Sequence, residues 1–216
     1  EFDFATLHDA GIRAGELRKR YDCIILPSQG VDGMVNGNAP DSTEPQYTGG
    51  MGDDGLIALQ RFVEEGGTLV CIDDACSLPV TRFRMPVRTI LSGKKSDEFY
   101  CPGSILRVRM EGGSALRSGL PEWISGYFAR SQAFEIVAPD SKANSSAIQC
   151  NATVVARYSE APLLESGWIR GEKLIEGKPA VIEATYGKGR IVLLGFRIQN
   201  RAQSSGTFRL LFNALR

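Results

Sequence analysis

The segment 61–80, RFVEEGGTLVCIDDACSLPV, constrains the fold more than any other part of the chain. Residues 69–72 form a continuous apolar run of strand length that follows Gly66 and Gly67. Such a run is typical of a strand that is covered on both faces, as in the parallel sheets of α/β proteins. Asp73 to Ser77 then lie in the turn at the carboxyl end of this strand, where open α/β sheets usually place their ligands.

Other segments extend this pattern in both directions. The apolar residues 23–26 before Pro27 predict a second buried strand, and residues 53–65 predict an amphipathic helix. Residues 180–186 and 190–196 flank Gly187-Lys188-Gly189, which is a hairpin signal. Residues 206–215 predict a closing helix with Phe208, Leu211, Phe212 and Leu215 inward, and residues 2–7 predict a short strand.

These elements predict one α/β domain over residues 1–216. Strands and helices alternate in the first half, whereas hairpin strands dominate the second half. We therefore expect a mostly parallel central sheet flanked by helices, with an antiparallel C-terminal extension.

Composition excludes several functional classes. The 25 basic residues balance the 25 acidic ones, so no general surface for nucleic acid or anionic membranes is predicted. No apolar run approaches the roughly 20 residues of a membrane span. The N-terminus lacks the basic-then-apolar pattern of a signal peptide, so any export signal is expected upstream of residue 1.

The five cysteines give no metal-binding signature, because no CxxC pair occurs among them. Cys23 and Cys71 fall in the predicted strands and are expected to be small core side chains. A Cys76–Cys101 or a Cys101–Cys150 disulfide is possible, and the spacing does not decide between a bridge and free thiols.

The turn after the strand at 69–72 holds the candidate catalytic side chains, Cys76, Asp73 and Asp74. A helix N-terminus would lower the pKa of Cys76, whereas the two aspartates would raise it. The aspartates themselves suit an acid/base pair or a cation site, or else a helix cap and a solvated side chain. His8 is the only histidine and is expected on a surface turn, so the cysteine lacks an obvious base. No catalytic residue is therefore assigned.

Two further patterns point to no cofactor. Gly50, Gly52 and Gly55 spell GxGxxG, but no strand precedes them and the following aspartates would repel a pyrophosphate. A flexible loop leading into a helix is the expected structure. A zinc centre needs clustered ligands, and one histidine without an HExxH pattern argues against zinc catalysis in this chain.

Segments along nearly the whole chain, in order, resemble one known family. They are YDCIILPSQG, YTGGMGDDGLIALQRFVEEGGTLVCID, EFYCPGSILRV, YFARSQAFEIV, LLESGWIRGE and YGKGRIVLLGFRIQNRAQSSGTFRLLFNAL. They resemble the C-terminal region of secreted bacterial proteins of the zinc carboxypeptidase (carboxypeptidase A-like) family. In those proteins a class I glutamine amidotransferase-like, flavodoxin-related domain follows the catalytic domain.

This resemblance implies a flavodoxin-like domain that has kept its fold and lost its chemistry. The zinc ligands of the family belong to the upstream domain, and no position here matches them. The amidotransferase triad does not carry over either, because Asp73 or Asp74 stands near the cysteine position. The late loop at 198–205 offers Gln199, Asn200, Arg201 and Gln203 in place of a histidine. The resemblance also implies that the chain lacks the first β-α unit of such domains.

Three functions follow as expectations. The first is a non-catalytic accessory domain that docks on the zinc carboxypeptidase-like domain of the same secreted or periplasmic polypeptide. The second is a stand-alone hydrolase or amidotransferase that uses Cys76. The third is a small-ligand or glycan-binding module built on the loop 28–50, Trp123 and Trp168.

Overall fold

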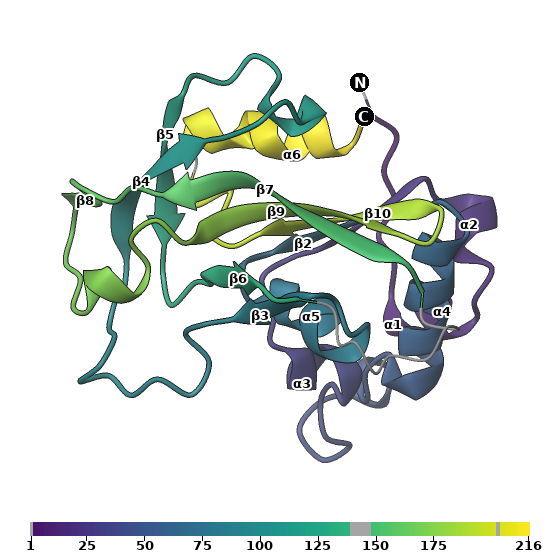
Figure 1. Ribbon diagram of the computed structural model, residues 1–216. Helices are drawn as coiled ribbons and strands as arrows, with labels where there is room; N and C mark the ends of the chain where they lie inside the picture. Colours follow the sequence, from purple (N-terminus) through teal and green to yellow (C-terminus); the bar gives the residue numbers. More distant parts are fainter. Residues whose placement is uncertain (1, 139–147, 202–203) are drawn as a thin grey trace.

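The computed structural model describes residues 2–138, 148–201 and 204–216 (Figure 1). Its main feature is an eight-stranded sheet in the order β1-β2-β10-β9-β7-β4-β5, with β8 beside β4. The strands are β1 (Cys23–Leu26), β2 (Thr68–Ile72), β4 (Ser104–Met110), β5 (Trp123–Phe128), β7 (Cys150–Tyr158), β8 (Leu164–Ser166), β9 (Pro179–Tyr186) and β10 (Gly189–Leu194). A small second sheet pairs β3 (Val87–Thr89) with β6 (Phe134–Ile136).

The predicted fold class is confirmed: the molecule is an α/β protein with a flavodoxin-like arrangement. Strand β2 lies between β1 and β10 and runs parallel to both, so that Thr68 aligns with Cys23 on one side and Arg190 on the other. From β10 outward, β9, β7, β4 and β5 pair in antiparallel fashion and form the predicted extension.

Helices cover both faces of this sheet (Figure 1). The helices α1 (Asp9–Arg13), α3 (Val31–Val35), α4 (Gly52–Glu64) and α5 (Ser77–Arg82) lie on one side, and α2 (Leu17–Arg20) packs against α4. Helix α6 (Phe208–Ala214) lies on the opposite side. Short 3-10 turns are η1 (Pro45–Tyr47), η2 (Asp73–Cys76), η3 (Ala115–Arg117), η4 (Glu172–Leu174) and η5 (Ser205–Thr207). None of the helices in the described part of the chain is long and apolar enough to cross a bilayer.

Each face of β2 belongs to its own hydrophobic core. Leu69 and Cys71 point into the core on the α4 side, together with Leu59. Val70 points into the core on the α6 side, together with Leu210. This two-sided burial explains why the β2 sequence is continuously apolar instead of alternating.

The predicted hairpin between β9 and β10 is confirmed, and glycine is required within it. Gly187 has a φ of 58°. A Cβ on Gly189 would lie 2.1 Å from the Val63 carbonyl oxygen and 2.4 Å from that of Gly67. The end of α4 therefore packs directly on the hairpin backbone, and only glycine allows this approach.

One prediction about the chain ends is wrong, and another is wrong in part. Residues 2–7 form no strand, and the Phe2 ring stacks on Phe212 of α6 at 6.3 Å between ring centroids. Phe208 and Leu211 of α6 pack against the core as predicted, but Phe212 faces outward with 49% exposure, and the fully buried positions of the helix include Leu210 and Ala214. The contact of α6 with the sheet, and not the hydrophobicity of its side chains, decides which face is buried.

Both proposed disulfides are also wrong, since all five cysteines are free. Cys76 lies in the core on the α4 side, whereas Cys101 lies in the core on the α6 side. Cys150 is half-buried and packs against the α4-side core. The sheet therefore separates Cys101 from both of its proposed partners.

Candidate functional site

The carboxyl ends of the parallel strands meet in one polar cluster. Ser28 follows β1, Asp73 follows β2, and Arg197 follows β10. The Ser28 hydroxyl donates to Asp73 Oδ2 at 2.7 Å, and Arg197 Nε donates to the same oxygen at 3.0 Å. Because parallel neighbouring strands end at the same edge of a sheet, these three side chains come together from distant parts of the sequence.

Asp73 has an unusual backbone and an unusual environment. Its φ is 58°, a left-handed conformation that costs a non-glycine residue about 1–3 kcal/mol. Its side chain is fully buried, and Oδ1 has no hydrogen-bond partner among the described residues. A strained strand-to-helix turn of this kind presents the nucleophile in many α/β hydrolases. Here the same position holds an inward-facing, ion-paired carboxylate.

This environment corrects the sequence interpretation of Asp73. The residue is neither a helix cap nor a solvated side chain, because η2 has no side-chain cap and Asp73 is 0% exposed. Sequence reasoning also missed Ser28 and Arg197 as its partners. The separations of 45 and 124 residues explain this omission, since no local pattern connects them.

Asp74 lies beside Asp73 and is half-buried. Its Oδ1 accepts a hydrogen bond from Gln132 Nε2 at 3.1 Å. Burial raises the pKa of Asp74, and the neighbouring Asp73 carboxylate raises it further. The Gln132 hydrogen bond, followed by Arg197 and Arg130, opposes this shift only in part. The pKa of Asp74 therefore remains raised, because the nearby donors and cations offset the effects of burial and of Asp73 only in part.

Gln132 is held in place by two backbone contacts. Its N–H donates to the Gly195 carbonyl at 2.7 Å, and its own carbonyl accepts from the Tyr158 hydroxyl at 2.7 Å. The segment after β5 is thereby joined to the end of β10 and to β7. No pattern in the sequence indicates this role for Gln132.

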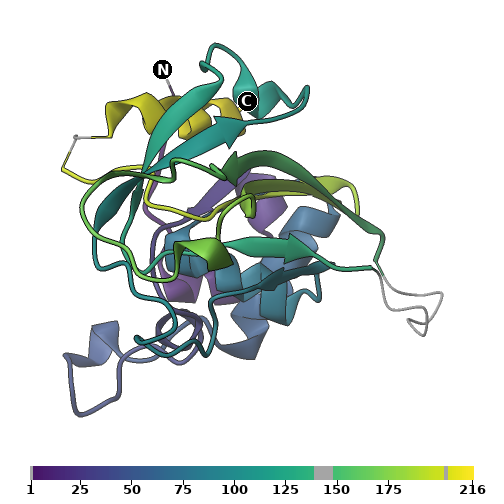
Figure 2. The ribbon, with the colours of Figure 1, turned by 60° about the vertical axis from the view of Figure 1, so that its left-hand side comes forward.

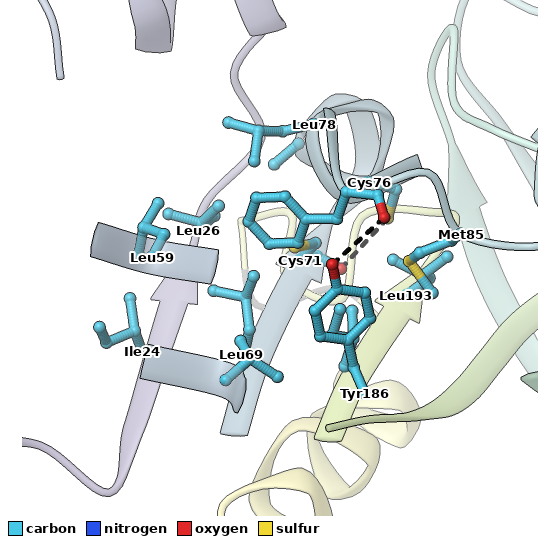
Figure 3. Packing of buried hydrophobic residues seen from close by; sticks show 14 of the residues in the cluster. Ile24, Leu26, Leu59, Leu69, Cys71, Cys76, Leu78, Met85, Tyr186 and Leu193 are labelled. Atoms are coloured by element: carbon cyan, nitrogen blue, oxygen red, sulfur yellow. Dashed lines mark hydrogen bonds between the residues drawn. The ribbon is translucent and has the colours of Figure 1, made fainter. Parts of the chain in front are cut away.

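Cys76 does not reach the surface. It is 0% exposed, and its Sγ donates to the carbonyl oxygens of Cys71 at 3.2 Å and Leu194 at 3.4 Å. Figure 3 shows it among apolar side chains that include Leu78 and Met85. Burial raises the pKa of the Cys76 thiol well above its usual value, and Cys71 and Asp73 add to this shift. Cys76 is thus placed as a core side chain, without solvent access.

No base is placed beside Cys76 within the described residues. His8 is exposed and precedes α1 as its N-cap residue. In the late loop, Gln199, Asn200 and Arg201 are described, whereas Gln203 lies outside the described residues. The described part of the chain also contains no cluster of three or more His, Cys, Asp or Glu side chains arranged to hold a metal ion.

The GxGxxG motif has a packing role. A Cβ on Gly50 would lie 2.6 Å from the Val35 carbonyl oxygen, and Gly52 begins α4 with a φ of 61°. Gly50 therefore allows the chain to pass close to α3. Asp53 and Asp54 occupy the first turn of α4, where they oppose a phosphate.

The two tryptophans lie in separate places on the antiparallel extension. Trp123 on β5 has the Arg107 guanidinium 4.3 Å from its ring centroid. Trp168 is 48% exposed and contacts the Tyr100 ring edge-on at 5.5 Å. Neither lines the hollow between β6, β7 and β9 or the hollow between α1, α2 and α4. The third expectation, a ligand pocket built on these aromatics, gains no support from this placement.

Comparisons with known proteins agree with this fold. No protein-family model and no curated protein sequence matches the chain. Among solved structures, cytoplasmic protein STM3548 from Salmonella typhimurium is similar at 15% identity over 99% of this chain and 80% of that chain, with a TM-score of 0.57. Cytoplasmic protein STM1381 from Salmonella typhimurium LT2 is similar at 15% identity over 98% of this chain and 75% of that chain, with a TM-score of 0.52. PurLQS from Thermotoga maritima is similar at 13% identity over 91% of this chain and 81% of that chain, with a TM-score of 0.53.

At such low identities these likenesses establish the fold alone. The chain has a flavodoxin-like α/β fold that is consistent with the class I glutamine amidotransferase fold. In that fold, the turn after β2 is the position at which chemistry would be expected, and this chain places Asp73 there.

The Asp73–Arg197 ion pair should be required for stability. Replacing Arg197 with Gln leaves the buried carboxylate with Ser28 alone, so we expect the free energy of unfolding to fall by about 2 kcal/mol. Asp73→Asn should cost less, because an amide oxygen still accepts from Arg197. Urea unfolding would measure both, with the exposed Arg82→Gln as the matched control. Equal stability of Arg197→Gln and Arg82→Gln would contradict this role of the ion pair.

Asp74 should destabilise the folded protein as the pH rises. Its raised pKa means that the folded state holds the proton more tightly than the unfolded chain. The group therefore favours folding below its unfolded pKa, and this contribution is lost as the pH rises through the folded pKa. Asp74→Asn should increase the free energy of unfolding at pH 7 by a few tenths of a kcal/mol to about 1 kcal/mol, and should have no such effect at pH 3. Asp97→Asn, at an exposed position, is the matched control.

The cysteines should react with iodoacetamide according to burial. Burial raises the pKa values of Cys23 and Cys150 to about 11, so these half-buried thiols should react slowly at pH 8. Cys76 and Cys71 should react only after unfolding. Peptide mapping by mass spectrometry would identify the labelled sites. A Cys76 thiolate that titrates below the ordinary value of about 8.5 in the native protein would contradict the structural assignment.

Proposed function

We propose that this chain is a non-catalytic accessory domain, which docks on the zinc carboxypeptidase-like catalytic domain of a longer, exported polypeptide. The observation that carries this proposal is the state of the turn after β2. Asp73 is buried and ion-paired there, and Cys76 is enclosed in the core. Because this turn offers no exposed nucleophile, we infer that the domain acts by binding a partner and not by catalysis.

An apolar surface supports docking. Phe4 is 95% exposed, and Phe212 and Ile25 are 49% and 40% exposed. Phe2, which is 43% exposed, stacks on Phe212 and joins the N-terminal segment to α6. Large apolar side chains in an exposed group are typical of protein interaction sites. We call the stacked pair Phe2 and Phe212, together with Phe4 of the same N-terminal segment, the aromatic patch.

The edge of the sheet adds to this argument. Strand β1 pairs with β2 and has no second partner among the described strands. Ile24 and Leu26 face the α4-side core, whereas Ile25 points the other way and is exposed. Parallel strands are normally covered on both faces, so a partner that covers Ile25 would complete the usual arrangement.

The identity of the partner rests on the sequence resemblance. The similar segments extend from YDCIILPSQG to the closing RLLFNAL, and in the family that they resemble such a domain follows a zinc carboxypeptidase-like domain of a secreted bacterial protein. Zinc would belong to that catalytic domain. An interface within one polypeptide of this kind would bury roughly 600–1,500 Å².

Docking can be tested on the longer polypeptide and on its separated parts. We expect removal of residues 1–216 to lower the melting temperature of the catalytic domain or to change its kcat/KM for peptides. The double variant Phe4→Ser/Phe212→Ser should weaken association of the separated domains by about tenfold or more. Ile57→Ser is the matched control, because Ile57 is 58% exposed on α4, away from the aromatic patch.

The alternative functions give different results. Unchanged kcat/KM and melting temperature, together with separated domains that do not associate, would refute the docking role. Hydrolysis of glutamine that Cys76→Ser abolishes would instead establish an amidotransferase-type enzyme.

A further inference from the structure

We propose that strands β4 and β5 carry a binding site for an oxyanion, a carboxylate or a phosphate group, centred on Arg107. The site consists of Arg107 and Arg109 on β4 and of Trp123 and Ser125 on β5. These strands lie side by side at the end of the sheet farthest from α2 (Figures 1 and 2). The proposal is independent of the docking role.

Strand pairing brings the four side chains onto one face. Arg107 is aligned with Ser125, and Arg109 is aligned with Trp123. The alternate residues Leu106, Val108 and Ile124 are buried in the α6-side core. Directly opposite residues of antiparallel strands share a face, so the site residues face away from this core. Ser125 and Arg109 are exposed there.

The backbone of Arg107 is fixed on both sides. In addition to its pairing with β5, its N–H donates to the Leu163 carbonyl at 2.8 Å, and its carbonyl accepts from the Ser159 N–H at 2.9 Å. The guanidinium carbon lies 4.3 Å from the centroid of the Trp123 ring. The cation is therefore held in place before any ligand arrives, which reduces the entropy lost on binding.

Arg107 differs from the neighbouring arginines in its lack of a carboxylate. Arg109 pairs with Glu122 at 3.2 Å. Arg157, which is aligned with Arg109 on β7, pairs with Glu111 at 3.0 Å. Across the described ranges, no ion pair joins Arg107 to an acidic side chain. The local charge on this face is thus left positive at Arg107.

The geometry suits a planar or tetrahedral oxyanion. A guanidinium presents its N–H groups in a planar fork that matches a carboxylate or a phosphate. The Arg107 guanidinium carbon lies over the Trp123 ring, and the strand register places Ser125, which has a hydroxyl side chain, directly opposite Arg107. The Arg109 guanidinium carbon is 5.8 Å from the centroid of the same ring, but this arginine is already paired with Glu122, so the site is centred on Arg107.

Trp123 provides the measurement. The chain has two tryptophans, so Trp168→Phe leaves Trp123 as the sole indole fluorophore, in contact with the proposed site. This protein would be titrated with sodium phosphate and, separately, with sodium acetate, at constant ionic strength adjusted with sodium chloride. We expect a saturable change in Trp123 fluorescence. Saturation with phosphate alone assigns a phosphate ligand, and saturation with acetate alone assigns a carboxylate ligand.

Variants in the Trp168→Phe background establish the role of Arg107. Arg107→Gln should weaken binding by about tenfold or more, and Arg107→Lys should weaken it by about threefold, because lysine keeps the charge but not the fork. Arg61→Gln, at an exposed position on α4, should bind like the parent protein. Circular dichroism would confirm that each variant is folded. If Arg107→Gln does not fold, the affinity of Arg107→Lys tests the role of Arg107.

Two results would overturn the proposal. One is the absence of a saturable response to both anions beyond that of sodium chloride. The other is identical titration of the folded Arg107 variants and the parent protein.

Discussion

The ion pair between Asp73 and Arg197 holds together the edge of the sheet at which chemistry would be expected. It joins the end of β2 to the end of β10, and the Ser28 hydroxyl adds the end of β1. Because Asp73 is fully buried, its charge is tolerated only while these donors remain in place. Arg197 is 40% exposed, so solvent weakens the attraction itself. The larger effect is the penalty for an unpaired buried carboxylate. A turn that elsewhere displays a reactive group is here closed by an internal salt bridge.

Burial explains why the two other candidate residues of this turn differ so much. Asp74 remains half-exposed and in contact with Gln132, so it can titrate. Cys76 is three residues from Asp73 but lies in the apolar core, and within the described ranges its Sγ has only the backbone carbonyls of Cys71 and Leu194 as hydrogen-bond partners. A cysteine near a helix start is activated only if the positive end of the dipole and solvent both reach it. Neighbouring positions in one sequence motif therefore carry unrelated chemistry, and motif position alone does not assign function.

The parts that sequence predicts well are those with a local cause. The continuous apolar run of β2, the helix α4 and the Gly187-Lys188-Gly189 hairpin each follow from periodicity or from turn chemistry. The parts that it missed depend on contacts between distant residues. Ser28, Gln132 and Arg197 reach the turn after β2 from separations of 45, 58 and 124 residues. The prediction that Phe212 of α6 faces inward was wrong for the same reason. Its side chain is apolar enough for a core, but its position relative to the sheet leaves it exposed.

The position of β10 in the sheet determines the order in which the molecule can be completed. This strand is the last one in the described part of the chain, yet it lies between β2 and β9 and pairs with both. Thr68 and Arg190 are direct neighbours across β2 and β10 although most of the sequence separates them. During synthesis, one edge of β2 would stay unpaired until residues 189–194 have left the ribosome. Such long-range closure makes folding slow and leaves the nascent chain open to aggregation. A C-terminal truncation would consequently remove the middle of the sheet and not its margin.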